Sequence, residues 1–130
     1  MTTDLWMLVL SAVLCLVLPL PYLVARGITP GGVAWGLGNR EGEFRFPAWA
    51  GRAERAHRNL VENLAPFAIL VLVAQVTGRA NASTALGATL FFWGRVLHAL
   101  TYLAGIVYLR TAMFIVALIG EILILRQLLY

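Results

Sequence analysis

The sequence predicts an all-α integral membrane protein, a single four-helix bundle of up-down topology that occupies residues 1–130. Hydrophobic residues make up 61% of the chain and the mean hydropathy is +0.83, both well above the values of soluble proteins. The apolar residues gather in four segments of about 20 residues or more, the length that crosses a bilayer core as a helix. Short connections between the later segments make consecutive helices antiparallel neighbours.

The four predicted spans are the long apolar runs of the chain, at residues 5–25, 49–77, 83–105 and 109–129. Pro19 and Pro21 are expected to kink or end the first helix early, and Pro47 suits the first position of the second helix. Ser83 is the expected N-cap of the third helix. Residues 26–47 are rich in glycine and charged side chains and are expected to form a long loop.

Arginine is the only strongly basic residue type, because the chain contains no lysine. The first loop and the start of the second helix carry six arginines, whereas the second loop carries only Arg79. By the positive-inside rule, the first and third loops are cytoplasmic and both termini lie outside. The arginines are scattered, which excludes a nucleic-acid-binding run. Cys15 is the only cysteine, so neither an intramolecular disulfide nor a cysteine-based metal site is possible.

A polar stripe marks the start of the second helix. At 100° per residue, Arg55, Arg58, Asn59 and Glu62 fall on one face. Polar groups at membrane depth are costly, and they usually face the interior of a bundle or a wet cavity. The stripe therefore predicts a binding surface inside a membrane protein.

The third helix repeats this pattern. Arg95, His98 and Tyr102 stand at positions i, i+3 and i+7 of one face, and Arg110 follows at the start of the fourth helix. With the predicted topology all four lie toward the cytoplasmic half. The two histidines of the chain, His57 among them, lack the spacing of a metal site, and no metal is predicted.

Arg95 is expected to lie about 15 Å deep, at 1.5 Å per residue from the end of its helix. Glu62 or Glu121 is expected to neutralise its charge. A purely structural ion pair that fixes the register of the helices is the alternative to a role in a site. The convergence of polar stripes from two helices with a nearby arginine favours the site.

Such a cluster suits an anionic, zwitterionic ligand with several carboxylates. Arginine forks hold carboxylates through paired hydrogen bonds, and a glutamate receives an ammonium group. A tyrosine hydroxyl or a guanidinium beside a thiol stabilises its thiolate. The apolar surface gives a lipophilic second substrate a route from the bilayer.

Two blocks of the sequence resemble the signatures of the MAPEG family, the membrane-associated proteins in eicosanoid and glutathione metabolism. The first is Glu-Arg-Ala-His-Arg-Asn-Leu-Val-Glu-Asn at residues 54–63, followed by Pro66. The second is Gly-Arg-Val-Leu-His-Ala-Leu-Thr-Tyr at residues 94–102, with Arg110 after it. Within the family, the first block is most similar to microsomal glutathione transferase. His98 stands where the leukotriene-synthesising branch has a tyrosine, which argues against that specificity.

The resemblance implies a homotrimer of four-helix protomers that binds glutathione as a co-substrate between adjacent subunits, toward the cytosol. The implied glutathione-binding residues are Arg55, His57, Asn59, Glu62, Arg95 and His98. His57 occupies a position that in relatives reaches the ligand from the neighbouring subunit. Arg110 and Tyr102 are the implied catalytic residues, of which Arg110 stabilises the thiolate.

The activity that this implies is that of a glutathione S-transferase in detoxification, which conjugates lipophilic electrophiles or reduces hydroperoxides. The alternative is a non-catalytic MAPEG protein that binds a lipid or a partner protein. An oligomeric channel has little support, because the polar residues gather on one side of the membrane instead of lining a whole span.

Overall fold

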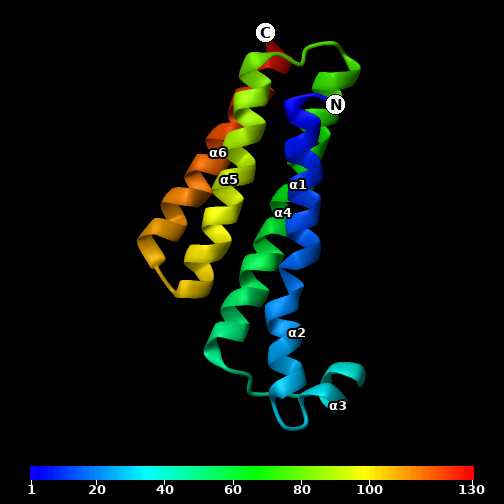
Figure 1. The fold of residues 1–130 in the computed structure, drawn as a ribbon, viewed down its shortest axis with the longest axis vertical. Coiled ribbons are helices and arrows are strands. Elements are labelled where there is room, and N and C mark those ends of the chain that lie inside the picture. Colours follow the sequence, from blue (N-terminus) through cyan, green and yellow to red (C-terminus); the bar gives the residue numbers. More distant parts are fainter.

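A computed structural model describes all residues, 1–130, and it contains helices and no strands (Figure 1). The all-α prediction is therefore confirmed. The helices follow in the order α1 (Thr3–Val17), α2 (Pro19–Ile28), α3 (Gly32–Leu37), α4 (Ala48–Val76), α5 (Ala82–Ala104) and α6 (Val107–Leu129). Helices α4, α5 and α6 begin and end within two residues of the apolar segments predicted at 49–77, 83–105 and 109–129, whereas α1 ends at Val17.

Three helical segments are long and apolar enough to cross a membrane. They are Thr3–Ile28, which comprises α1 and α2, together with α4 and α6. The break at Leu18, with Pro19 in the first turn of α2, confirms the early end predicted for the first helix. Helix α5 is not among the three segments, since its inner face carries Arg95 and His98 together with glycines and threonines.

The prediction of one long loop over residues 26–47 was wrong in part. Helix α2 continues to Ile28, and Gly32–Leu37 forms the short helix α3. Gly31 adopts a left-handed conformation (φ 77°), which lets the chain reverse before α3. Trp35 of α3 then packs against Phe44 and Phe46, with ring centroids 5.7 and 5.4 Å away. This aromatic cluster gives a glycine-rich segment a surface on which to fold.

Two predicted helix starts need correction. Pro47 is the N-cap of α4 and not its first helical residue. Asn81, not Ser83, caps α5, because its side-chain oxygen accepts hydrogen bonds from the N–H groups of Ser83 and Thr84 (2.8 and 3.2 Å). The Thr84 hydroxyl accepts the N–H of Asn81 in return, at 2.9 Å, which completes a capping box.

Helices α5 and α6 form the closest pair in the bundle. Gly87 and Gly120 face each other across it, and Gly94 lies against Ala117. Small residues let the two backbones approach. Beside these glycines on α5, the ring of Phe91 stacks on that of Phe67 with centroids 3.8 Å apart, which joins the pair to α4.

The predicted site residues lie toward one end of the molecule. The two termini lie together at one end, and α3 lies at the other (Figure 1). The α5–α6 turn points toward the α3 end. The Nε of Arg52, near the start of α4, donates to the carbonyl oxygen of Leu103 at the end of α5, at 3.0 Å. The first turns of α4 therefore lie beside this turn.

Candidate functional site

Arg110 and Tyr102 meet across the turn between α5 and α6. Gly105 ends α5 in a left-handed conformation (φ 79°), so that the chain reverses within a few residues. The guanidinium carbon of Arg110 lies 4.4 Å from the centroid of the Tyr102 ring, and that of Arg55 lies 5.9 Å from it. Two arginines therefore flank one phenol, which suits stabilisation of a negative charge close to the hydroxyl.

A recess of about 300 Å³ opens beside this pair. It is lined by side chains of three helices, namely Asn59, His98, Tyr102, Arg110, Thr111 and Phe114. Four of the six are predicted site residues. Thr111 and Phe114 were missed, although Phe114 follows Arg110 by four residues and so shares its helix face. The recess combines one cation, an amide, an imidazole and two hydroxyls with an apolar wall, and it can hold a small polar ligand.

Arg95 lies behind the recess and does not line it. Only 2% of the residue is exposed. One of its terminal nitrogens donates to both the backbone carbonyl and the side-chain oxygen of Asn59, each at 2.7 Å. Its guanidinium carbon lies 5.8 and 5.7 Å from the ring centroids of Phe91 and Phe114. Arg95 thus holds Asn59 in place at the edge of the recess.

The expected ion pair of Arg95 with Glu62 or Glu121 is absent. Arg58 and Glu54 form the only ion pair of the chain, and Glu62 is exposed. Glu121 is buried, and one of its carboxylate oxygens has no partner. Arg95 precedes the end of α5 by nine residues, whereas Glu121 follows the start of α6 by fourteen. The carboxylate therefore lies about 7 Å further along the helix pair, and the amide of Asn59 is the nearer partner.

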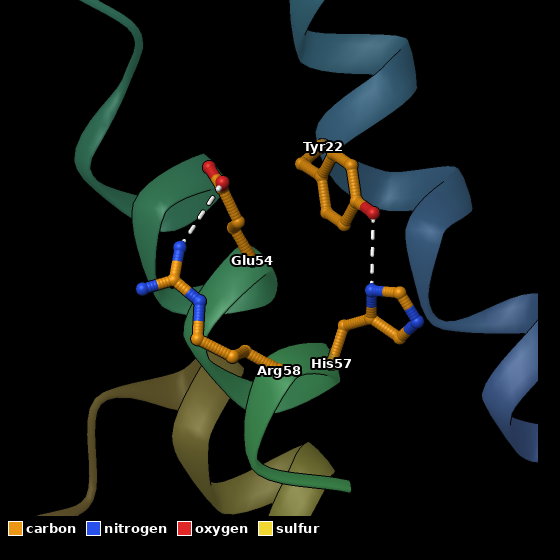
Figure 2. A network of polar contacts seen from close by, with 4 residues as sticks. All are labelled: Tyr22, Glu54, His57 and Arg58. Carbon is orange, nitrogen blue, oxygen red and sulfur yellow. Dashed lines mark hydrogen bonds and ion pairs between the residues drawn. The ribbon is translucent and has the colours of Figure 1, made fainter. Parts of the chain in front are cut away.

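His57 faces away from the recess. Its Nδ1 lies 3.0 Å from the hydroxyl of Tyr22, and its Nε2 lies 3.8 Å from the sulfur of Cys15. Figure 2 shows His57 and Tyr22 facing each other between α4 and α2, while Glu54 and Arg58 pair on another side of α4 at 3.6 Å. Within this chain, His57 and the Arg110–Tyr102 pair are thus on different faces.

The residues of the predicted polar stripe of α4 also point in different directions. Asn59 faces α5, while Arg55, Arg58 and Glu62 are exposed. Arg55 also borders a second, larger recess of about 610 Å³ between α2, the segment before α4 and the start of α4. The chain therefore gathers Asn59, His98, Tyr102 and Arg110 into one recess, and the other predicted ligands lie outside it.

No individual curated protein matches the chain. The profile of the MAPEG family matches residues 5–130, which is nearly the whole chain. With the membrane-capable helices, this match identifies an integral membrane protein, and the chain belongs to the MAPEG family.

Proposed function

We propose that this protein is a membrane glutathione transferase or peroxidase, which binds glutathione and activates it as a thiolate for reaction with lipophilic electrophiles or hydroperoxides. The observation that carries this proposal is the guanidinium of Arg110 over the ring of Tyr102, 4.4 Å away, at a recess shared with Asn59 and His98. A fixed cation beside a hydroxyl donor is the environment that favours a thiolate over a thiol.

Each residue of the site has a role in this proposal. Arg110 stabilises the thiolate by its charge, and the Tyr102 hydroxyl donates a hydrogen bond to the sulfur. Asn59 and His98 bind amide groups of the peptide. Arg55 binds a carboxylate and Glu62 the ammonium group, because a guanidinium and a carboxylate match these charges.

The proposed assembly is a homotrimer of protomers with α5 as a fourth span. Arg55, Arg58 and Glu62 are exposed on α4, and Glu62 lies about 20 Å from the start of that helix. A charge exposed to lipid at such a depth is costly. A neighbouring subunit over this face removes the cost, and it also brings a second copy of His57 to the glutathione site.

The proposed orientation has the first loop and the site in the cytoplasm and both termini outside. It rests on the excess of arginine in and around the first loop. The position of both termini at the end opposite α3 is consistent with it (Figure 1).

In the transferase reaction, glutathione releases its thiol proton to water. The thiolate forms a carbon–sulfur bond with the electrophile, and the leaving group departs with its electron pair. In the peroxidase reaction, the thiolate attacks the oxygen–oxygen bond, and the alkoxide released takes up a proton to give an alcohol. A second glutathione then converts the oxidised sulfur into the disulfide and water. The apolar surfaces of α1, α4 and α6 bring the lipophilic substrate from the bilayer.

The proposal is tested by ultraviolet difference absorbance of the detergent-solubilised protein, titrated with glutathione at neutral pH. We expect a saturable thiolate band, and conjugation of a lipophilic aryl halide at the same glutathione concentrations. S-methylglutathione, which has no ionisable thiol, is the control and should bind without a band. Glutathione binding without a thiolate would contradict the proposed enzymatic activity and favour the non-catalytic alternative.

Arg95→Leu is expected to weaken glutathione binding about tenfold while the protein still folds. The substitution removes two hydrogen bonds to Asn59 and should cost about 1–3 kcal/mol of stability, because it leaves an acceptor without its donor. The freed Asn59 no longer holds its position, and about 1.4 kcal/mol of affinity corresponds to the tenfold loss. Arg95→Lys is the matched variant: it keeps the buried charge without the planar fork, and its melting temperature should fall further. Unchanged glutathione affinity in both variants would exclude this positioning role.

A further inference from the structure

Two buried polar atoms lack a hydrogen-bond partner where α5 packs against α6. They are the Nε of Arg95 and one carboxylate oxygen, Oε1, of Glu121. Arg95 is 2% exposed and Glu121 is 9% exposed. The hydrogen bonds of Arg95 to Asn59 come from a terminal nitrogen, so they leave its Nε–H unused. Sealing a donor or an acceptor away from water without a partner is costly, and buried polar groups therefore have one as a rule.

Glu121 lies deep within the membrane-capable helix α6. It follows the start of this helix, Val107, by fourteen residues and precedes its end, Leu129, by eight. At 1.5 Å per residue, it is about 21 and 12 Å from the two ends. A carboxylate at such a depth is costly unless a charged or polar group compensates it. The charged side chain that acts on it is Arg95.

The two side chains lean toward each other along the helix pair. Side chains lean toward the N-terminus of their helix, and α5 and α6 run in opposite directions (Figure 1). The guanidinium of Arg95 follows this rule, since it lies 5.8 Å from the ring centroid of Phe91, four residues earlier. It also lies 5.7 Å from the ring centroid of Phe114 on α6. Glu121 follows Phe114 by seven residues and so shares its face of α6.

The separation of the two groups suits a bridging water molecule. The backbone of Glu121 lies about 7 Å further along the helix pair than that of Arg95, and the lean of both side chains shortens the distance between their ends. Two hydrogen bonds through one water span up to about 5.5 Å. Enclosed waters commonly satisfy buried polar groups that do not reach each other directly.

We propose that Glu121 is a positioning residue of the recess, and that it acts on Arg95 through one enclosed water. The Nε–H of Arg95 donates to the water oxygen, and the water donates to Oε1 of Glu121. The carboxylate also compensates the charge of Arg95 across this bridge. Arg95 is thereby held from two sides, by Glu121 on α6 and by Asn59 on α4. The bridge is independent of the proposed function, whereas its effect on glutathione binding rests on that function.

The bridge is tested without glutathione, by solid-state NMR of the protein in lipid bilayers with isotope-labelled arginine. We expect the Nε–H of Arg95 to receive magnetisation from water, and Glu121→Leu to lose this transfer. Arg95→Lys removes the signal and so assigns it. Absence of the transfer in the native protein would overturn the bridge.

Melting temperatures in detergent test the compensation of charge. Glu121→Leu alone should lower the melting temperature, because it leaves the buried charge of Arg95 without its counter-charge. The same substitution should raise the melting temperature of Arg95→Leu, in which the carboxylate is the unpaired charge. Such a reversal of sign is the mark of a coupled pair. An equal fall in both backgrounds would show a packing role for Glu121 and overturn the pairing.

Glutathione affinity, measured well below the melting temperatures, tests the positioning role. Loss of about one hydrogen bond corresponds to a weakening of about fivefold in Glu121→Leu. Glu121→Gln keeps an oxygen that accepts from the water, and it should bind glutathione more tightly than Glu121→Leu. Glu43→Gln removes an exposed carboxylate and is the control, with the expected affinity of the native protein.

The outcomes separate this inference from the proposed function. Native glutathione affinity in Glu121→Leu would overturn the positioning role, although the native protein binds glutathione as proposed. If the native protein bound no glutathione, the proposed function would fail, and the NMR and melting experiments would still decide whether the bridge between Arg95 and Glu121 exists.

Discussion

Replacement of Arg110 by alanine is expected to abolish the thiolate absorbance of bound glutathione and to lower the turnover number roughly 100-fold. Arg110 lines the recess and its guanidinium stacks on Tyr102 at 4.4 Å, so it is the one cation in the recess near the phenol. Without it, the pKa of the bound thiol should return toward about 8.5, the value of a free cysteine thiol. Most of the glutathione would then bind as the unreactive thiol at neutral pH.

The measurement is the difference spectrum at saturating glutathione, with a parallel assay of conjugation across pH. Arg126→Ala is the matched control, because Arg126 is an exposed arginine in the last turn of the same helix. The rate of Arg110→Ala should rise with pH as the thiol ionises in solution, whereas the rates of the native protein and the control should already be level. A normal thiolate band in Arg110→Ala would remove Arg110 from the mechanism.

The helices were predictable because their signals are local. Long apolar runs separated by breaks define helices by length alone, and Pro19 places the break in the first span within the sequence itself. Helix α3 was not predictable, since glycine-rich residues 31–38 become helical through packing of Trp35 on Phe44 and Phe46. The cap of α5 was misplaced because Asn81 and Ser83 are both good caps, and only the reciprocal bonds with Thr84 distinguish them.

The candidate site could be predicted where helix periodicity determines which side chains share one face of a helix. His98 and Tyr102 share a face, and both line the recess. His57 lies about 200° around the helix from Arg55, which already indicates that it faces another element. What periodicity cannot supply is the relative height of two helices. The partner of Arg95 was therefore misjudged, because α4 places Asn59 at the level of Arg95, whereas the turn at Gly105 leaves Glu121 about 7 Å further along the helix pair.

Gly120→Ala is expected to destabilise the protein by about 3 kcal/mol, the upper part of the range for overpacking. A Cβ at this position would overlap the carbonyl oxygen of Gly87 and lie 2.8 Å from the backbone nitrogen of Phe91. Both obstacles are backbone atoms, so relief requires that α5 and α6 move apart. Gly27→Ala is the control, because no atom lies within 4 Å of the Cβ that it would add in α2. Because alanine favours a helix over glycine by up to about 1 kcal/mol, Gly27→Ala should be at least as stable as the native protein.

The melting temperature of each variant in detergent measures this difference, and glutathione affinity measures its effect on the site. Gly120 is remote from the recess, but the recess is built from α5 and α6 together, with His98 and Tyr102 on one helix and Arg110 on the other. Separation of the two helices should therefore weaken glutathione binding in Gly120→Ala, although no ligand contact is removed. If Gly120→Ala melted at the native temperature with native affinity, the close approach of α5 and α6 would not be what holds Arg110 over Tyr102.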